Sequence, residues 1–310
     1  MNALPNSADV QPDSHGSDFG ESELANRPLS RPLIRPFPGG LGAEIRGVDL
    51  NRPFTGAIGE CIQDAFLLHH LVVVRDQELT KDRMGEFAAL FGEIEGNVFR
   101  NPDGSTLAAI HEISNLDAEG RPAENSYVKS NYHWHTDKSY TPVPALLTML
   151  HAIELPQSGG DTQFADMTSA YDALSDDDKR RIAGLFVVHS LQYMRESTGD
   201  RPPTDAERAA APPVTHPLVR THPQTGQKSL FLGMYCSHVV GLDASESRAL
   251  LDRLLAHATQ PRFMYTHRWQ PGDLVFWDNR CLLHRAVANY DMDKSRRVLQ
   301  RLVVRGNAAP

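Results

Sequence analysis

The stretch NYHWHTDKSY, residues 131–140, is the part of the chain on which the rest of the interpretation depends. Its aromatic residues favour an extended strand. Alternate side chains of a strand share one face, so His133, His135 and Asp137 are expected to point the same way. An imidazole and a carboxylate two residues apart can bind one metal ion without a bend in the backbone. His135 and Asp137 are therefore predicted metal ligands, and His133 remains an alternative.

A catalytic metal needs a further protein ligand from elsewhere in the chain. The best candidate is His284, which lies in the stretch WDNRCLLHR, residues 277–285. Two histidines and one carboxylate on one side of an ion leave its other positions open, an arrangement typical of non-haem Fe(II) oxygenases. A His-x-Asp match also occurs by chance, so support must come from other segments.

The composition is that of an ordinary globular protein, with 310 residues, 40% hydrophobic and 23% charged. A formal net charge of -8 does not suggest a nucleic-acid or anionic-membrane partner, and no apolar run approaches membrane-spanning length. An anionic ligand would need local basic residues. The early residues lack an apolar signal region, and the three cysteines form no paired motif. We therefore expect a cytoplasmic protein with reduced thiols.

The chain divides into a leader and one domain. Residues 1–32 are rich in Ser, Asn, Pro, Asp and Gly without apolar periodicity, which predicts a disordered leader before a single domain over 33–310. The segment 191–213 is polar, contains four prolines and shows no periodicity. A segment of that length without regular structure is usually a lid or a disordered excursion, so a lid-like excursion is predicted there.

Short strands outnumber helices in the predicted secondary structure. Apolar spacing predicts helices over 58–70, 81–91 and 168–185, and a further helix after Asp243. Thr80 is the predicted N-cap of the second helix. This balance predicts a mainly β protein with flanking helices, arranged as a barrel or double-sheet jelly roll. The predicted strands are 41–50, 71–75, 107–113, 146–155, 161–164, 186–189, 214–219, 229–232, 263–269, 274–277, 281–287 and 297–304.

Several motifs in a fixed order add a family resemblance. With His-x-Asp, the distal His, GGDT (159–162) and RRVLQR (296–301), the sequence resembles the taurine and 2,4-dichlorophenoxyacetate dioxygenase family of Fe(II)/2-oxoglutarate enzymes. The likeness runs from about residue 42 to 305 and implies a double-stranded β-helix. It is closest to the aryloxyacetate branch around FADM (164–167), YDAL (171–174), PLVRTH (217–222) and GDLVFWDNRC (272–281).

The resemblance assigns roles to individual residues. His135, Asp137 and His284 would bind iron, and Thr162 with Arg297 would bind the distal carboxylate of 2-oxoglutarate. A planar guanidinium can fork onto a carboxylate, which agrees with that role. Period-two spacing places Arg301 on the same strand face as Arg297. The family uses this position to bind the anionic end of the substrate or cosubstrate.

Three further residues are predicted to contact substrate: Arg100, Asn131 and Lys138. Relatives place a basic residue near the substrate carboxylate where Arg100 stands, and contact substrate where Asn131 stands. Lys138 departs from the small or apolar residue of relatives, and faces either substrate or solvent.

The expected activity is hydroxylation of a small anionic substrate, such as an aryloxyalkanoate or related carboxylate, with Fe(II), 2-oxoglutarate and O2 and release of succinate and CO2. Hydroxylation next to an ether oxygen would cleave the ether. The alternatives are a sulfonate or N-acyl amino acid hydroxylase, a non-catalytic small-acid-binding protein and a zinc hydrolase. A homo-oligomer is expected.

Overall fold

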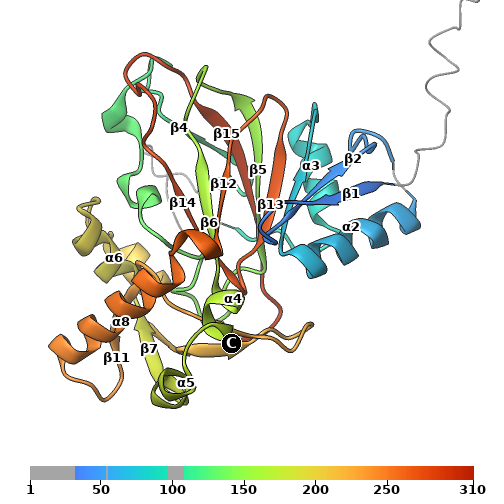
Figure 1. Ribbon diagram of the computed structural model, residues 1–310. Helices are drawn as coiled ribbons and strands as arrows, with labels where there is room; N and C mark the ends of the chain where they lie inside the picture. Colours follow the sequence, from blue (N-terminus) through green and yellow to red (C-terminus); the bar gives the residue numbers. More distant parts are fainter. Residues whose placement is uncertain (1–31, 54, 97–107) are drawn as a thin grey trace, which may run out of the picture.

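The structure is a computed structural model that describes residues 32–53, 55–96 and 108–310 (Figure 1). A seven-stranded sheet and a three-stranded sheet stack around a shared core, with helices outside. This arrangement confirms the predicted mainly β double-stranded β-helix. In spatial order, the large sheet contains β1 (Leu33–Pro36), β2 (Ala43–Arg46), β3 (Leu71–Val74), β13 (Leu274–Asp278), β5 (Leu147–Glu154), β15 (Val298–Val304) and β4 (His111–Ser114), and the small sheet contains β12 (Met264–His267), β6 (Thr162–Asp166) and β14 (Leu282–Ala286).

Strand β13 shows why the large sheet is buried on both faces. Leu274 and Phe276 pack into the core on the outer face, whereas Val275 and Trp277 pack into the core between the two sheets. Alternation of side chains along a strand produces this division, and it explains the continuous apolar run in the sequence. Phe164 from the small sheet meets Trp277 edge-to-face, with ring centroids 5.2 Å apart. The predicted site lies beside this inter-sheet core.

Helices α2 (Gly56–His69) and α3 (Lys81–Ala88) cover the outer face of the large sheet (Figure 1). Phe66 and Phe87 bury their rings against that face. Thr80 is the N-cap of α3, as predicted, because its side chain accepts a hydrogen bond from the main chain at the start of the helix.

The remaining elements form a layer next to the small sheet. The predicted helix over 168–185 is wrong in extent, because it is two helices. Ser175 caps the second helix and the chain turns between them. The elements of this layer are α4 (Met167–Asp172), α5 (Asp176–Ile182), β7 (Phe186–His189), β8 (Val214–Pro217), β9 (Val219–Thr221), β10 (Lys228–Leu230), β11 (Cys236–Val239), α8 (Ala244–Ala258) and the 3-10 helix η3 (Pro261–Phe263).

The segment 191–213 has regular structure that the sequence prediction missed. It contains helix α6 (Leu191–Thr198) and helix α7 (Asp205–Ala210). Thr204 and Glu207 form a reciprocal capping box at the start of α7, and the Glu207 side chain is 1% exposed. Helices this short carry too few apolar positions for a periodic signal. A lid motion of this segment stays a prediction.

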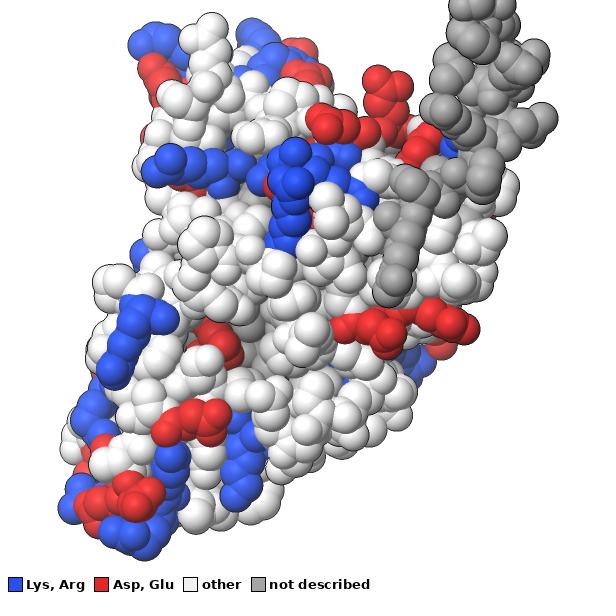
Figure 2. All heavy atoms as spheres, turned by 45° about the vertical axis from the view of Figure 1, so that its right-hand side comes forward, with Lys and Arg blue, Asp and Glu red and all other residues white. Residues whose placement is uncertain are grey.

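In Figure 2, charged side chains gather along the upper part and at the lower left of the face, with uncharged surface between them. Basic and acidic side chains lie close together in both places, so neither carries charge of one sign alone. Within the described ranges, no helix is both long and apolar enough to cross a bilayer. The predicted leader, residues 1–32, lies outside the described residues except for residue 32, and Arg100 also lies outside them.

Candidate active site

The predicted site residues come together in one cavity of about 590 Å³ beside the inter-sheet core. They come from strands β6, β14 and β15, from the position directly before β15, and from residues 131–138, which precede β5. Residues separated by more than half the length of the chain therefore share one space. The predicted site residues that line this cavity are Asn131, His135, Asp137, Lys138, Thr162, His284, Arg297 and Arg301.

The backbone that carries the first two metal ligands is not the predicted strand. The 3-10 helix η2 (Lys129–Tyr132) comes first, and His135 then forms an isolated antiparallel bridge with His284. Asp137 lies in a turn that also contains Lys138, whose φ of 57° is left-handed. His133 is exposed and lines a different pocket, so the expectation that it shares a face with the ligands is wrong.

The three predicted ligands converge at short distances. Nε2 of His135 lies 3.9 Å from Oδ1 of Asp137, and Nε2 of His284 lies 3.7 Å from Oδ2. Nδ1 of His135 donates to the main-chain oxygen of His133 at 2.7 Å, which leaves Nε2 as the nitrogen with a free lone pair. One donor atom from each ligand therefore lies within 4.8 Å of the other two, as a bound metal ion requires.

The protonation states also suit a metal site. Burial holds the pKa of His135 below its usual value and that of His284 well below it, so both imidazoles are neutral at neutral pH. Burial alone would raise the pKa of Asp137, but the charge of Arg301 and the hydrogen bond from the Thr148 hydroxyl hold it below the usual range. Two neutral imidazoles and one carboxylate form the donor set that Fe(II) takes in oxygenases.

Arg297 and Thr162 form a second polar group in the cavity. Nε of Arg297 donates to the main-chain oxygen of Gly160 at 2.9 Å, so the two Nη groups remain for a ligand. Gly160 has a φ of 69°, and a Cβ there would lie 3.0 Å from the Arg297 side chain. Oγ1 of Thr162 accepts from Nε1 of Trp269 at 3.0 Å, so its own hydrogen is available to a ligand. The pair suits a carboxylate.

Two further cations face the predicted metal site. Nη2 of Arg301 lies 2.7 Å from Oδ1 of Asp137. Lys138 is only 3% exposed, although its Nζ lies 3.6 Å from the nearest carboxylate oxygen, that of Glu95. Burial lowers the pKa of Lys138, and Glu95 opposes that effect. The sequence left open whether Lys138 faces the substrate site or solvent. The structure buries its side chain and places it in the wall of the cavity.

Aromatic and thioether side chains form another wall of the same cavity. Tyr140 and Tyr235 are buried with ring centroids 4.8 Å apart, and Met194 of α6 packs against them. Because α6 belongs to the segment 191–213, that segment contributes directly to the cavity wall. The cavity therefore offers cations and an apolar surface to one small molecule.

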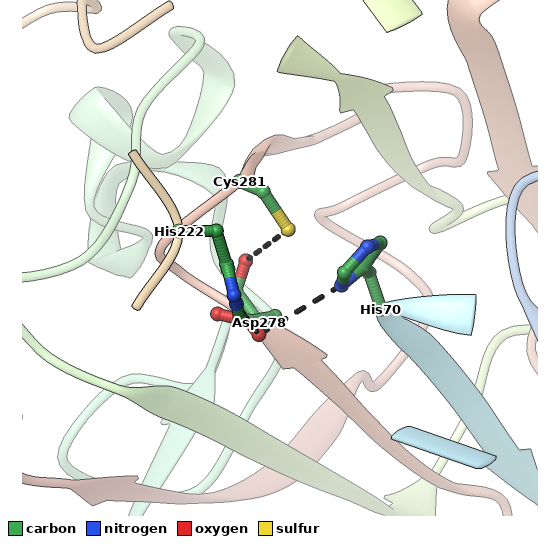
Figure 3. A group of neighbouring side chains, drawn as sticks. All are labelled: His70, His222, Asp278 and Cys281. Carbon is green, nitrogen blue, oxygen red and sulfur yellow. Dashed lines mark hydrogen bonds and ion pairs between the residues drawn. The ribbon is translucent and has the colours of Figure 1, made fainter. Parts of the chain in front are cut away.

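Outside this cavity, one other group among the described residues has metal-ligating side chains within 4.8 Å of one another. Figure 3 shows this group, which contains His70, His222, Asp278 and Cys281, around the Asp278 carboxylate. Arg280, which is not drawn in Figure 3, donates to both carboxylate oxygens at 2.8 and 2.7 Å. A metal ion would have to displace that guanidinium.

The tautomer of His222 also argues against a metal in this second group. Its Nδ1 accepts from the main-chain nitrogens of Gln224 and Thr225 at 3.3 and 3.1 Å. Its Nε2 therefore carries the hydrogen and donates to Asp278 at 2.9 Å, with no lone pair left for an ion. The group is a buried hydrogen-bonded cluster that fixes the turn after β13.

The chain belongs to the taurine catabolism dioxygenase TauD, TfdA family, whose model matches residues 33–303. It is 43% identical over 244 residues to the alpha-ketoglutarate-dependent 2,4-dichlorophenoxyacetate dioxygenase of Burkholderia sp. (strain RASC), covering 76% of this chain and 82% of that protein. It is 38% identical over 275 residues to the (S)-phenoxypropionate/alpha-ketoglutarate-dioxygenase of Sphingobium herbicidovorans, covering 85% and 91%.

A solved structure agrees with these relatives. The crystal structure of AAD-2 in complex with Mn(II) and N-oxalylglycine matches with a TM-score of 0.81 and 35% identity, over 90% of this chain and 98% of that one. The protein is therefore an enzyme, an Fe(II)/2-oxoglutarate-dependent dioxygenase that uses O2. The predicted family resemblance is confirmed, and the predicted ligands provide a donor set that fits the metal.

Some residues around the site were not found from the sequence. Tyr235 and Met194 lie in segments without a recognised motif, and Glu95 has meaning only through its contact with Lys138. Asn279 stands inside a recognised motif, yet its contact with Thr148 spans 131 residues of sequence. None of these contacts has a local sequence signal.

Proposed function

We propose that this enzyme hydroxylates a small aromatic carboxylate of the aryloxyalkanoate class at the carbon next to the ether oxygen. The observation that carries the proposal is a single cavity with Arg301 and Lys138 next to the ligand triad and an aromatic wall of Tyr140 and Tyr235. The cations suit the carboxylate, and the wall suits the aryl group. The phenoxy acids that appear in the names of its relatives combine an aryl group with a carboxylate.

In the proposed mechanism, His135, Asp137 and His284 hold Fe(II), while Thr162 and Arg297 hold the distal carboxylate of 2-oxoglutarate. The iron, when bound, supplies the oxidising power for C–H hydroxylation. One C–H bond, O2 and 2-oxoglutarate become one C–OH group, succinate and CO2. Hydroxylation next to the ether oxygen produces a hemiacetal from an aryloxyacetate or a hemiketal from an aryloxypropionate, which separates into a phenol and an aldehyde or a ketone.

The anionic end of the substrate is proposed to contact Arg301 and Lys138, with Asn131 and Arg100 as further contacts. A local group of cations is needed because the formal net charge of -8 would otherwise disfavour an anion. Positioning the substrate between these cations and the tyrosine wall brings one C–H bond toward the metal. The chain's own residues thus bind and orient the substrate, and exclude water from it.

A substrate panel tests the proposal. Purified enzyme with Fe(II), 2-oxoglutarate and O2 is offered an aryloxyacetate, an aryloxypropionate, an alkyl sulfate, a sulfonate and an N-acyl amino acid, and succinate and phenol are quantified. The aryloxyalkanoates should raise succinate formation and yield one phenol per succinate. If only the sulfate, the sulfonate or the N-acyl amino acid raises succinate, the proposed substrate class is wrong. Asp137→Ala serves as the inactive control.

We also infer one domain over 33–310 and a cytoplasmic location. One family model spans 33–303, which supports the single domain. Cys61, Cys236 and Cys281 are all free, which supports a reducing compartment. The predicted homo-oligomer is tested by light scattering on the purified protein.

A further inference from the structure

Two buried polar residues lie directly behind the predicted metal ligand Asp137. Thr148 belongs to β5, and Asn279 follows β13 immediately. The two strands are antiparallel neighbours with Trp277 opposite Thr148. Both Thr148 and Asn279 are 0% exposed, and neither lines the cavity. Buried polar groups of this kind are retained where their hydrogen bonds are satisfied.

The hydrogen-bond donors around Asn279 define the orientation of its amide. Oδ1 accepts from Nε1 of Trp277 at 3.2 Å and from the main-chain nitrogen of Asp137 at 3.2 Å. Both of these nitrogens can only donate, so the atom that faces them must be the amide oxygen. Nδ2 of Asn279 therefore faces Oγ1 of Thr148, at 2.9 Å.

The direction of the next hydrogen bond follows from this orientation. Nδ2 of Asn279 has hydrogens only, so the Thr148 hydroxyl accepts from it and must donate its single hydrogen elsewhere. Oδ2 of Asp137 lies 2.5 Å from that hydroxyl and accepts it. Oδ1 of the same carboxylate faces Arg301 at 2.7 Å, so both carboxylate oxygens are fixed.

The cluster around Asp278 fixes the backbone directly before Asn279. Asp278 accepts from His222 and Arg280, and its main-chain nitrogen donates to the main-chain oxygen of His70 at 2.8 Å. The main-chain nitrogen of Asn279 donates to Leu146 at 2.9 Å. The turn that carries Asn279 is therefore fixed on both sides, by the contacts of Asp278 before it and by its own bond to Leu146.

We propose that Asn279 and Thr148 are positioning residues that orient the Asp137 carboxylate for metal binding. The inference rests on the proposed metal site and adds two residues that do not themselves touch the metal. A ligand carboxylate that is held in advance by a directed hydrogen bond loses less conformational freedom when the ion binds. Outer hydrogen bonds of this kind tune the affinity of metal sites.

The test is metal affinity, measured by titrating Co(II) into full-length protein that has been stripped of metal. Thr148→Val keeps the branched shape and removes the hydroxyl, so its dissociation constant should rise by about 10–100-fold. Thr148→Ser keeps the hydroxyl and should bind Co(II) within about threefold of wild type. Asn279→Asp should weaken Co(II) binding as Thr148→Val does, because the new carboxylate competes for the Thr148 hydrogen.

Ser229→Ala is the matched control. Ser229 is also 0% exposed, and its hydroxyl donates to the main-chain oxygen of Arg280 at 3.2 Å, away from Asp137. This variant should lower the melting temperature without changing Co(II) affinity. The positioning role of Asn279 and Thr148 is overturned if Thr148→Val folds and binds Co(II) as wild type does, or if Ser229→Ala weakens binding equally. If the wild-type protein binds no Co(II), the proposed function is overturned, and the positioning role of Asn279 and Thr148 is overturned with it.

Discussion

Arg297 should be the residue on which 2-oxoglutarate affinity depends most. Its side chain is held in place by Gly160 through Nε, and its backbone nitrogen donates to Oδ1 of Asn115 at 2.8 Å. Arg297→Ala therefore removes two available Nη groups without removing the backbone contact. A charge-assisted hydrogen bond contributes about 1.5–3 kcal/mol, so loss of the fork should cost about 3 kcal/mol, or roughly two orders of magnitude in affinity.

The neighbouring Arg296 provides a matched control. It points away from the cavity and pairs with Glu154 at the surface, with 43% of its side chain exposed. Arg296→Ala removes the same formal charge and should leave 2-oxoglutarate affinity unchanged, since exposed pairs contribute little. Calorimetric titration of 2-oxoglutarate into Mn(II)-loaded protein measures both variants. Equal losses in the two variants, or wild-type affinity in a folded Arg297→Ala protein, would mean that Arg297 does not bind the 2-oxoglutarate carboxylate.

Three further outcomes are expected. Lys138→Met should raise the KM for an aryloxyalkanoate about tenfold and leave 2-oxoglutarate affinity unchanged, which steady-state kinetics checks. Gly160→Ala should weaken 2-oxoglutarate binding by displacing the Arg297 side chain, as a calorimetric titration would show. Burial holds the pKa of His189 well below 6.5, so the unfolded chain binds more protons below that pH. Its contribution to stability is complete above about pH 6.5 and falls by up to roughly 1.4 kcal/mol per pH unit below it. Urea unfolding at pH 7 and 5 should show a smaller difference for His189→Phe than for wild type.

Features with a strong local pattern could be predicted from the sequence. The alternation in β13 and the apolar stripe that includes Met84 and Phe87 each result from burial of one repeating face. The candidate iron ligands could be found from the sequence because His-x-Asp and the distal His284 stand in motifs, and the structure brings the three side chains together. The strand assigned to His135 was nevertheless wrong, since the left-handed turn at Lys138 depends on packing rather than on propensity.

Contacts between distant segments could not be predicted. In the sequence, Thr148 is a single threonine within a mainly apolar strand, and nothing nearby indicates a role for its hydroxyl. Its contact with Asn279 is seen only in the folded structure. The helices α6 and α7 depend on a capping box and on packing against Tyr235 and Tyr140, not on a long apolar face. The alternation of side chains along a strand correctly placed Arg301 on the same face as Arg297. Its contact with Asp137 could not be predicted, because it joins segments far apart in the sequence.

Anaerobic absorption spectroscopy of the protein with Fe(II) and 2-oxoglutarate tests the central assignment of the site most directly. We expect one Fe(II) per chain and a weak visible metal-to-ligand band that appears only when both iron and 2-oxoglutarate are present. The band should be lost in His284→Ala. A flat difference spectrum from wild-type protein that is fully loaded with iron would mean that 2-oxoglutarate does not bind the metal at this site.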